Sequence, residues 1–88
     1  MNKLPIVIKK SVHYVGNRIF VVEFGIEQDW VTQNTSEEMF AVTFYEQGKG
    51  RRATGYQPMT GAGYTKSLSM YLDKVSEYRE FERIGEVI

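Results

Sequence analysis

The stretch Arg18-Ile-Phe-Val-Val-Glu-Phe-Gly-Ile26 has the alternating pattern of a long β-strand with one buried face. Successive side chains of a strand point to opposite sides of the sheet, so the pattern separates two faces. One face carries four large apolar side chains: Phe20, Val22, Phe24 and Ile26. The other face mixes apolar and acidic side chains: Ile19, Val21 and Glu23. The length of the run predicts a central strand, with the phenylalanine face turned to the core.

A β-hairpin is predicted directly before this strand. Gly16-Asn17 separates it from a β-rich run at Val12–Val15, and these two residue types accept the positive φ angles of a two-residue turn. Another strand is expected at Leu4–Ile8, where Pro5 suits the first residues of a strand or a sheet edge.

The next strand is predicted at Met39–Tyr45, after a polar, turn-like stretch at Gln33–Ser36. Its apolar side chains alternate onto one face: Phe40, Val42 and Phe44. Thr43 and Tyr45 point to the other side. This strand therefore offers a second phenylalanine-rich face that can share a core with the first.

The last third of the chain predicts a helix at about residues 64–84, because its apolar residues recur at three- and four-residue steps. The stripe comprises Leu68, Tyr71, Leu72, Val75, Tyr78, Phe81 and Ile84. Gly85 suits a left-handed cap after the last turn, and Thr60 and Thr65 are both candidate N-caps. Phe24 and Leu72 stand at the centres of their apolar stripes, so we expect both in the core.

The phenylalanine faces of the strands are the natural surface to receive this helix. The sequence therefore predicts an α+β fold in which an antiparallel sheet of three to four strands packs on one C-terminal helix. Eighty-eight residues are interpreted as a single domain, residues 1–88. Residues 48–63 are interpreted as a flexible, basic, glycine-rich segment, either one long loop or a loop with a short strand at about Ala53–Gln57.

Composition narrows the function classes. The chain has no cysteine, so disulfides and thiolate metal sites are excluded, and a reducing, cytoplasmic location is expected. Eleven basic and eleven acidic residues cancel, whereas domains that bind bulk nucleic acid are usually strongly basic. We expect neither a signal peptide nor a membrane span, since no apolar run is long enough.

The stretch GKGRRATGYQPMTGAGYTK, residues 48–66, is the candidate binding segment. It holds five of the eight glycines and four cations, with no Asp or Glu. The residues expected to contact a partner or a phosphate are Lys49, Arg51, Arg52, Tyr56, Tyr64 and Lys66. The alternative is a solvated surface. We expect joint replacement of the three hairpin cations by alanine to leave the fold nearly unchanged and to weaken the partner complex. A second candidate interface is Trp30 with Tyr45, although Trp30 also suits the rim of the core.

Glycines before Lys66-Ser67 resemble a phosphate-binding loop only in part. That motif places glycine directly before the lysine and four residues between its glycines. Here Thr65 precedes the lysine, and one residue separates Gly61 from Gly63. The glycines are therefore interpreted as a tight loop that leads into the helix, although a helix N-terminus still attracts anions.

Catalytic groups are scarce. His13 is the only histidine and is expected to be a half-exposed strand residue whose replacement by alanine leaves function intact. Ser11 lies on the same side of the same strand, but the sequence shows no third group to orient such a pair. Glu37-Glu38 is interpreted as solvated charge at a strand start. We therefore expect no catalytic residue, no metal and no cofactor.

Two main function hypotheses remain. The first is a small non-enzymatic binding module that modulates or inhibits a partner protein by occupancy. Accessory factors of this type include viral proteins that act on host machinery. The alternative is a nucleic-acid-binding protein that uses the basic Gly/Tyr loop at residues 48–66. A small-molecule or nucleotide binder, or a minimal enzyme, is a third class, and the sequence leaves homo-oligomerisation open.

Overall fold

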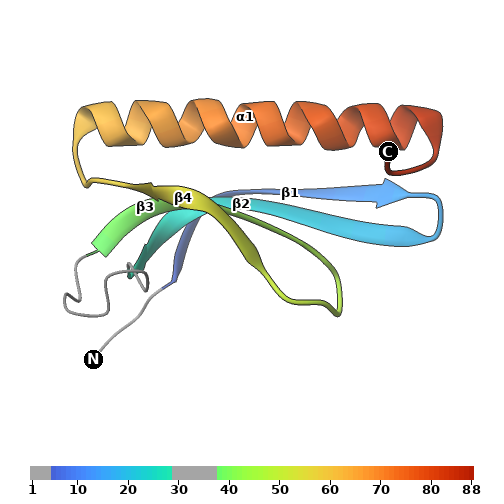
Figure 1. Cartoon of the computed structure of the whole chain (residues 1–88), viewed down its shortest axis with the longest axis horizontal. Coiled ribbons are helices and arrows are strands. Elements are labelled where there is room, and N and C mark those ends of the chain that lie inside the picture. The colour runs from blue at the N-terminus through green and yellow to red at the C-terminus, as the bar shows by residue number, and fades with distance from the viewer. Residues whose placement is uncertain (1–4, 29–37) are drawn as a thin grey trace.

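The computed structural model describes residues 5–28 and 38–88, and there the chain forms four strands followed by one helix. The elements are β1 (Ile6–Val15), β2 (Arg18–Gln28), β3 (Glu38–Glu46), β4 (Arg52–Gln57) and α1 (Gly61–Ile84). The strands make one antiparallel sheet in the order β1-β2-β3-β4. Helix α1 covers one face of this sheet (Figure 1). The predicted α+β fold, with an antiparallel sheet on a single C-terminal helix, is confirmed.

The first hairpin is longer than predicted. Its turn is at Gly16-Asn17 as expected, with Gly16 at φ 61°, but the two short strands predicted before it are one continuous β1. A bulge between Val7 and Lys9 interrupts the β1–β2 register. Near this bulge a Cβ on Gly25 would lie 2.0 Å from the carbonyl oxygen of Ile6. The strand pair can approach this closely because residue 25 lacks a side chain.

The core lies between the phenylalanine faces of β2 and β3 and the helix. Its buried residues are Val15, Phe20, Val22, Phe24, Phe40, Val42, Tyr71, Val75 and Tyr78. Phe24 is 0% exposed, and its ring centroid lies 5.8 Å from that of Phe40. Tyr64, in the first turns of α1, packs edge-on against both rings. Aromatic rings supply much of the area that so small a core can bury.

The helix begins at Gly61, three residues before the predicted start. Thr60 is the N-cap, and its side chain accepts a hydrogen bond of 3.0 Å from the backbone N–H of Gly63. Thr65, the other candidate cap, lies inside the helix. At the other end Gly85 has φ 84°, and its N–H donates to the carbonyl of Phe81. The predicted C-terminal cap is therefore confirmed.

The buried line of α1 differs from the predicted stripe. It runs through Gly63, Ser67, Tyr71, Val75 and Tyr78. Leu72 is 54% exposed and Ile84 is 38% exposed, so the prediction that Leu72 lies at the centre of the core is wrong. Each helical residue turns about 100° from the one before, and Tyr71 is the residue that points at the sheet. A stripe of seven apolar residues is wider than the contact that one helix makes with one sheet face.

Candidate binding surface at the β3–β4 hairpin

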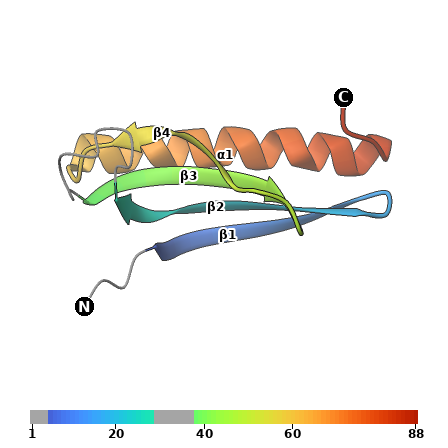
Figure 2. The same cartoon turned by 60° about the horizontal axis from the view of Figure 1, so that its bottom comes forward.

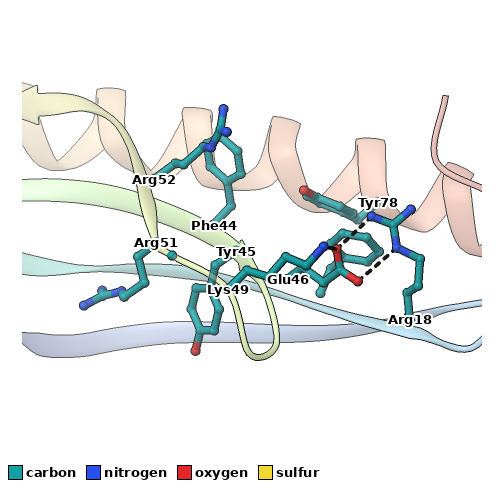
Figure 3. Close-up of a pocket in the computed structure, with 10 residues that line it drawn as sticks. Arg18, Phe44, Tyr45, Glu46, Lys49, Arg51, Arg52 and Tyr78 are labelled. Atoms are coloured by element: carbon teal, nitrogen blue, oxygen red, sulfur yellow. Dashed lines mark hydrogen bonds and ion pairs between the residues drawn. The ribbon is translucent and has the colours of Figure 1, made fainter.

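A hollow of about 460 Å³ opens between the β3–β4 hairpin and the C-terminal half of α1 (Figure 3). We call it the hairpin pocket. It is lined by Arg18, Phe20, Phe44, Tyr45, Glu46, Lys49, Gly50, Arg51, Arg52 and Tyr78. Three of its four cations, Arg18, Lys49 and Arg52, lie on the helix side of the hairpin with Glu46 as the single acid, whereas Arg51 points away from them (Figure 3). The pocket therefore combines an excess of positive charge with aromatic rings.

One carboxylate organises the cations at the right-hand end of Figure 3. Arg18 donates from Nη2 to Glu46 Oε1 at 2.7 Å and from Nε to Oε2 at 3.0 Å. Lys49 Nζ lies 3.5 Å from the same Oε1. The hydrogen bond from Arg18 is the largest cause that lowers the pKa of Glu46 to about 2. The carboxylate therefore stays charged at neutral pH, and it neutralises only one of the two cations beside it.

Aromatic rings lie under the cations of this surface. The guanidinium of Arg18 is 4.9 Å from the centroid of Phe20, and Lys74 Nζ is 4.4 Å from the centroid of Phe44. Figure 3 shows Arg52 beside Phe44 as well. Within residues 5–28 and 38–88, no carboxylate forms an ion pair with Arg52. Of the cations that line the pocket, Arg52 is thus the one without a carboxylate partner among the described residues.

Arg51 points the other way, because neighbouring strand residues face opposite sides of a sheet. Its Nη2 donates to Glu27 Oε2 at 3.0 Å, to Thr43 Oγ1 at 3.0 Å and to Glu23 Oε1 at 3.3 Å. These acceptors lie on the sheet face that α1 does not cover. These contacts argue against the expectation that all three hairpin cations can be removed at little cost to the fold, because Arg51 holds two carboxylates together.

The other predicted contact residues are dispersed. Tyr45 lies on the same open face as Arg51, with its hydroxyl 3.5 Å from Glu23, and burial is the largest cause that raises its pKa. Tyr56 pairs with Ala41 in the β4–β3 ladder. Tyr64 packs on core rings, and Lys66 is exposed near the start of α1, at the opposite end of the helix from Tyr78. The structure therefore joins Lys49 and Arg52 in one pocket but does not bring these residues together with Tyr64 and Lys66.

Three predictions at the β2–β3 connection lie outside the described residues. They are the interface role of Trp30, the turn at Gln33–Ser36 and the first member of the Glu37-Glu38 pair. Glu38 is exposed at the first position of β3, as expected for solvated charge at a strand start.

The sequence prediction for His13 is wrong. The imidazole is 2% exposed, and its ring stacks on Tyr78. Ser11 Oγ lies 2.6 Å from Nε2, and Glu82 Oε1 lies 3.0 Å from Nδ1. Glu82 also accepts from the backbone N–H of Tyr14 at 2.9 Å. Its carboxylate, which sequence reasoning missed because it is 69 residues from His13, is therefore the absent third group.

This Ser-His-Glu chain has the connectivity of a nucleophile with its base, but its surroundings fit a structural role. The imidazole is buried under a core tyrosine, and the hairpin pocket is lined by none of the three residues. Hydrogen bonding to His13 is the largest cause that lowers the pKa of Glu82. The chain ties the end of α1 to β1, so replacing His13 by alanine would cost stability rather than be silent.

The glycines before α1 serve packing. A Cβ on Gly63 would lie 1.9 Å from the carbonyl oxygen of Pro58, so only glycine allows the loop to lie against the first turn. Ser67, the residue after Lys66, is 1% exposed and turned into the core. The resemblance to a phosphate loop therefore ends at residue composition.

Comparison with known proteins adds no analogy. No protein-family model matches the chain, and no curated protein or solved structure matches it.

Among residues 5–28 and 38–88, no cluster of three or more His, Asp or Glu side chains could hold a metal ion. In the same part of the chain no helix is long and apolar enough to cross a membrane. A function must therefore be argued from the geometry of the surface.

Proposed function

We propose that the protein is a small non-enzymatic binding module that modulates or inhibits a partner protein by occupancy, with the hairpin pocket as its contact surface. The observation that carries the proposal is the charge balance of this pocket. Arg18 and Lys49 share one carboxylate, and Arg52 has none among the described residues. An acidic segment of a partner would neutralise this excess, while the aromatic floor would cover its aliphatic parts.

The composition of the pocket suits a protein partner. Tyrosine and arginine are the residues that most often anchor protein interfaces, and the pocket contains both. Burial is the largest cause that raises the pKa of Tyr78, so its hydroxyl stays neutral and can donate to a carboxylate. The separation of Tyr64 and Lys66 from Arg52 disfavours the alternative, a nucleic-acid site, because stacking rings and phosphate-binding cations would need to follow one strand.

The test pairs a charge change inside the pocket with an equal change outside it. Lys49→Gln/Arg52→Gln removes the two available cations, and Lys66→Gln/Arg79→Gln removes two exposed cations of α1. An oligo-glutamate peptide is the probe, and binding is measured by titration calorimetry. We expect the affinity of the pocket variant for the peptide to fall at least about tenfold. The control variant should bind the peptide like the parent. Equal weakening of both variants would overturn the pocket assignment.

The nucleic-acid alternative has its own arm in the same experiment. If each of the two pocket cations neutralised one phosphate, log K for single-stranded oligo-dT would fall against log salt with a slope of about −1.4. Tighter binding of oligo-dT than of oligo-glutamate would favour the alternative.

Occupancy is tested with the natural partner, which is isolated by pull-down from nuclease-treated lysate. Its response should saturate at one equivalent of protein, whereas a response from catalytic amounts would contradict the proposal.

A further inference from the structure

Strand β1 forms one edge of the sheet. Figure 2 shows it as the outermost strand, and β2 is its only neighbour in the ladder of the described residues. It is ten residues long, whereas β4 at the other edge has six residues and an irregular register. Edge strands present unpaired backbone groups to solvent, and long ones invite pairing with another chain.

The two-residue turn fixes which backbone groups of β1 point outward. Val15 and Arg18 close the turn and face each other as a hydrogen-bonded pair. The backbone N–H and C=O groups of Ser11 and His13 therefore also point toward β2, and those of the residues between them point away. The N–H of Tyr14 confirms this alternation, because it donates to Glu82 rather than to β2. Lys10 and Val12 therefore direct their backbone N–H and C=O groups to the outside of the sheet.

The Glu82 carboxylate blocks only one end of this edge. It accepts a hydrogen bond from the N–H of Tyr14, so a pairing strand can extend from Val12 toward Ile6 but not past Tyr14.

Several apolar side chains of this stretch are exposed although they belong to a strand: Ile6, Val7, Ile8 and Val12. Leu72 of α1 is also exposed.

Leu72 lies on the flank of α1 that is nearer to this edge. Lys74 contacts Phe44 of β3, and Leu72 lies about 200° around the helix from Lys74. It therefore occupies the flank of α1 that lies above β1, where Glu82 reaches His13. A strand added outside β1 would place one row of its side chains under this leucine.

The charge of the edge selects among occupants. Lys9 and Lys10 lie in the middle of β1, which contains no acidic residue. Neither lysine forms an ion pair within residues 5–28 and 38–88. Antiparallel pairing of two copies of β1 would bring four of these lysines close to the two-fold axis, and like charges across strands are destabilising. A second copy of this chain is therefore disfavoured.

We propose that the outer edge of β1 is a second docking site, which takes an extended, acidic segment of a partner protein as an added strand. Backbone groups of Lys10 and Val12 pair with the segment. Its carboxylates lie on the open face of the sheet beside Lys10, and one of its aliphatic side chains, on the helix face, packs against Leu72. The site is independent of the hairpin pocket, which lies on the β3–β4 side of the molecule.

Amide exchange of the full chain tests the first step. In the free protein the amides of Lys10 and Val12 should exchange quickly, and those of Ser11 and His13 slowly. Addition of the peptide acetyl-Val-Glu-Val-Glu-Val-Glu-Val-amide should slow exchange at Lys10 and Val12. The same peptide with lysine in place of glutamate should not. Unchanged exchange with the acidic peptide, or equal slowing by both peptides, would overturn the proposal.

Variants separate the backbone contact from the side-chain contact. Val12→Pro removes one outward N–H, which an edge strand tolerates, and should weaken binding of the acidic peptide about tenfold. Val12→Ala keeps the N–H and should stay within about threefold of the parent. If the proline variant does not fold, Leu72→Glu replaces it as the test, because Leu72 is exposed. This variant should also bind the acidic peptide more weakly than the parent. Slow exchange of Lys10 and Val12 without peptide, with a mass that doubles as concentration rises, would assign the edge to a second copy instead.

Discussion

Replacing Arg51 by alanine should destabilise the fold, whereas the same change at Arg52 should not. Arg52 is the first residue of β4 and Arg51 directly precedes it, yet their side chains lie on opposite faces of the sheet. Arg51 is the only cation that the described residues place within ion-pairing distance of Glu23 and Glu27. Glu23 is only 9% exposed. Removal of Arg51 would leave its carboxylate without a compensating charge.

The magnitude follows from how deeply the pair is buried. Loss of one partner from a fully buried ion pair costs about 3–5 kcal/mol. The side chain of Arg51 is 39% exposed and that of Glu23 is 11% exposed, so water screens part of the interaction. We therefore expect Arg51→Ala to lower the free energy of unfolding by about 2 kcal/mol. For a domain of this size that corresponds to a fall in Tm of about 10 °C.

Urea unfolding followed by circular dichroism measures both variants. Arg52→Ala, the matched control, should stay within about 0.5 kcal/mol of the parent. Adding Glu23→Gln to Arg51→Ala should recover about half of the loss, because a neutral amide costs less to bury than an unpaired carboxylate. The reasoning is refuted if Arg51→Ala and Arg52→Ala are equally stable, or if Glu23→Gln deepens the loss.

Three further outcomes test the core and the hairpin. Phe24→Ala should cost about 3–5 kcal/mol, whereas Leu72→Ala should cost less than about 1 kcal/mol because its side chain is largely exposed; similar losses in urea unfolding would contradict this packing. The folded pKa of Glu46, about 2, lies below its ordinary value of 4.5, so its ion pair with Arg18 stabilises the fold above pH 4.5 and is lost as the pH falls toward 2. Thermal melts should therefore show a steeper decline over this range for the parent than for Glu46→Gln, and parallel curves would argue against the pair. Ser67→Ala should leave stability unchanged or raise it by about 1 kcal/mol, since the buried hydroxyl has no hydrogen-bond partner among the described atoms; a clear loss would reveal a partner.

Sequence periodicity predicted the sheet because its signal is local. Alternation in β2 and β3 places Phe24 and Phe40 on one face without reference to the rest of the chain. The width of the helix stripe is not local, since the sheet decides which of Tyr71 and Leu72 points inward. Close approaches also follow from the tertiary arrangement, and no local pattern indicates that Gly25 and Gly63 each face a carbonyl oxygen at a distance that excludes a side chain.

The candidate site was predictable only as a group of charges. A run of cations without acids marks residues 48–66, and two of those cations do line one pocket. Which of Arg51 and Arg52 is available depends on where Glu23 and Glu27 lie, and these residues belong to a strand more than twenty positions away. The partner of His13 was hidden for the same reason, because α1 runs alongside β1 in the same direction and brings Glu82 to the end of that strand.

Zero net charge does not argue against an anionic partner for this chain, because its charges are partitioned between faces. On the open face of the sheet, Arg51 is held by two carboxylates and contributes no free charge. On the helix side of the hairpin, Lys49 and Arg52 exceed the single Glu46, and Lys9 and Lys10 mark the far edge. Glu77 is paired with Lys74 and Glu80 with Arg83, so these acids do not offset the cations of the pocket or of the edge. Local charge, rather than the total, decides what each surface attracts.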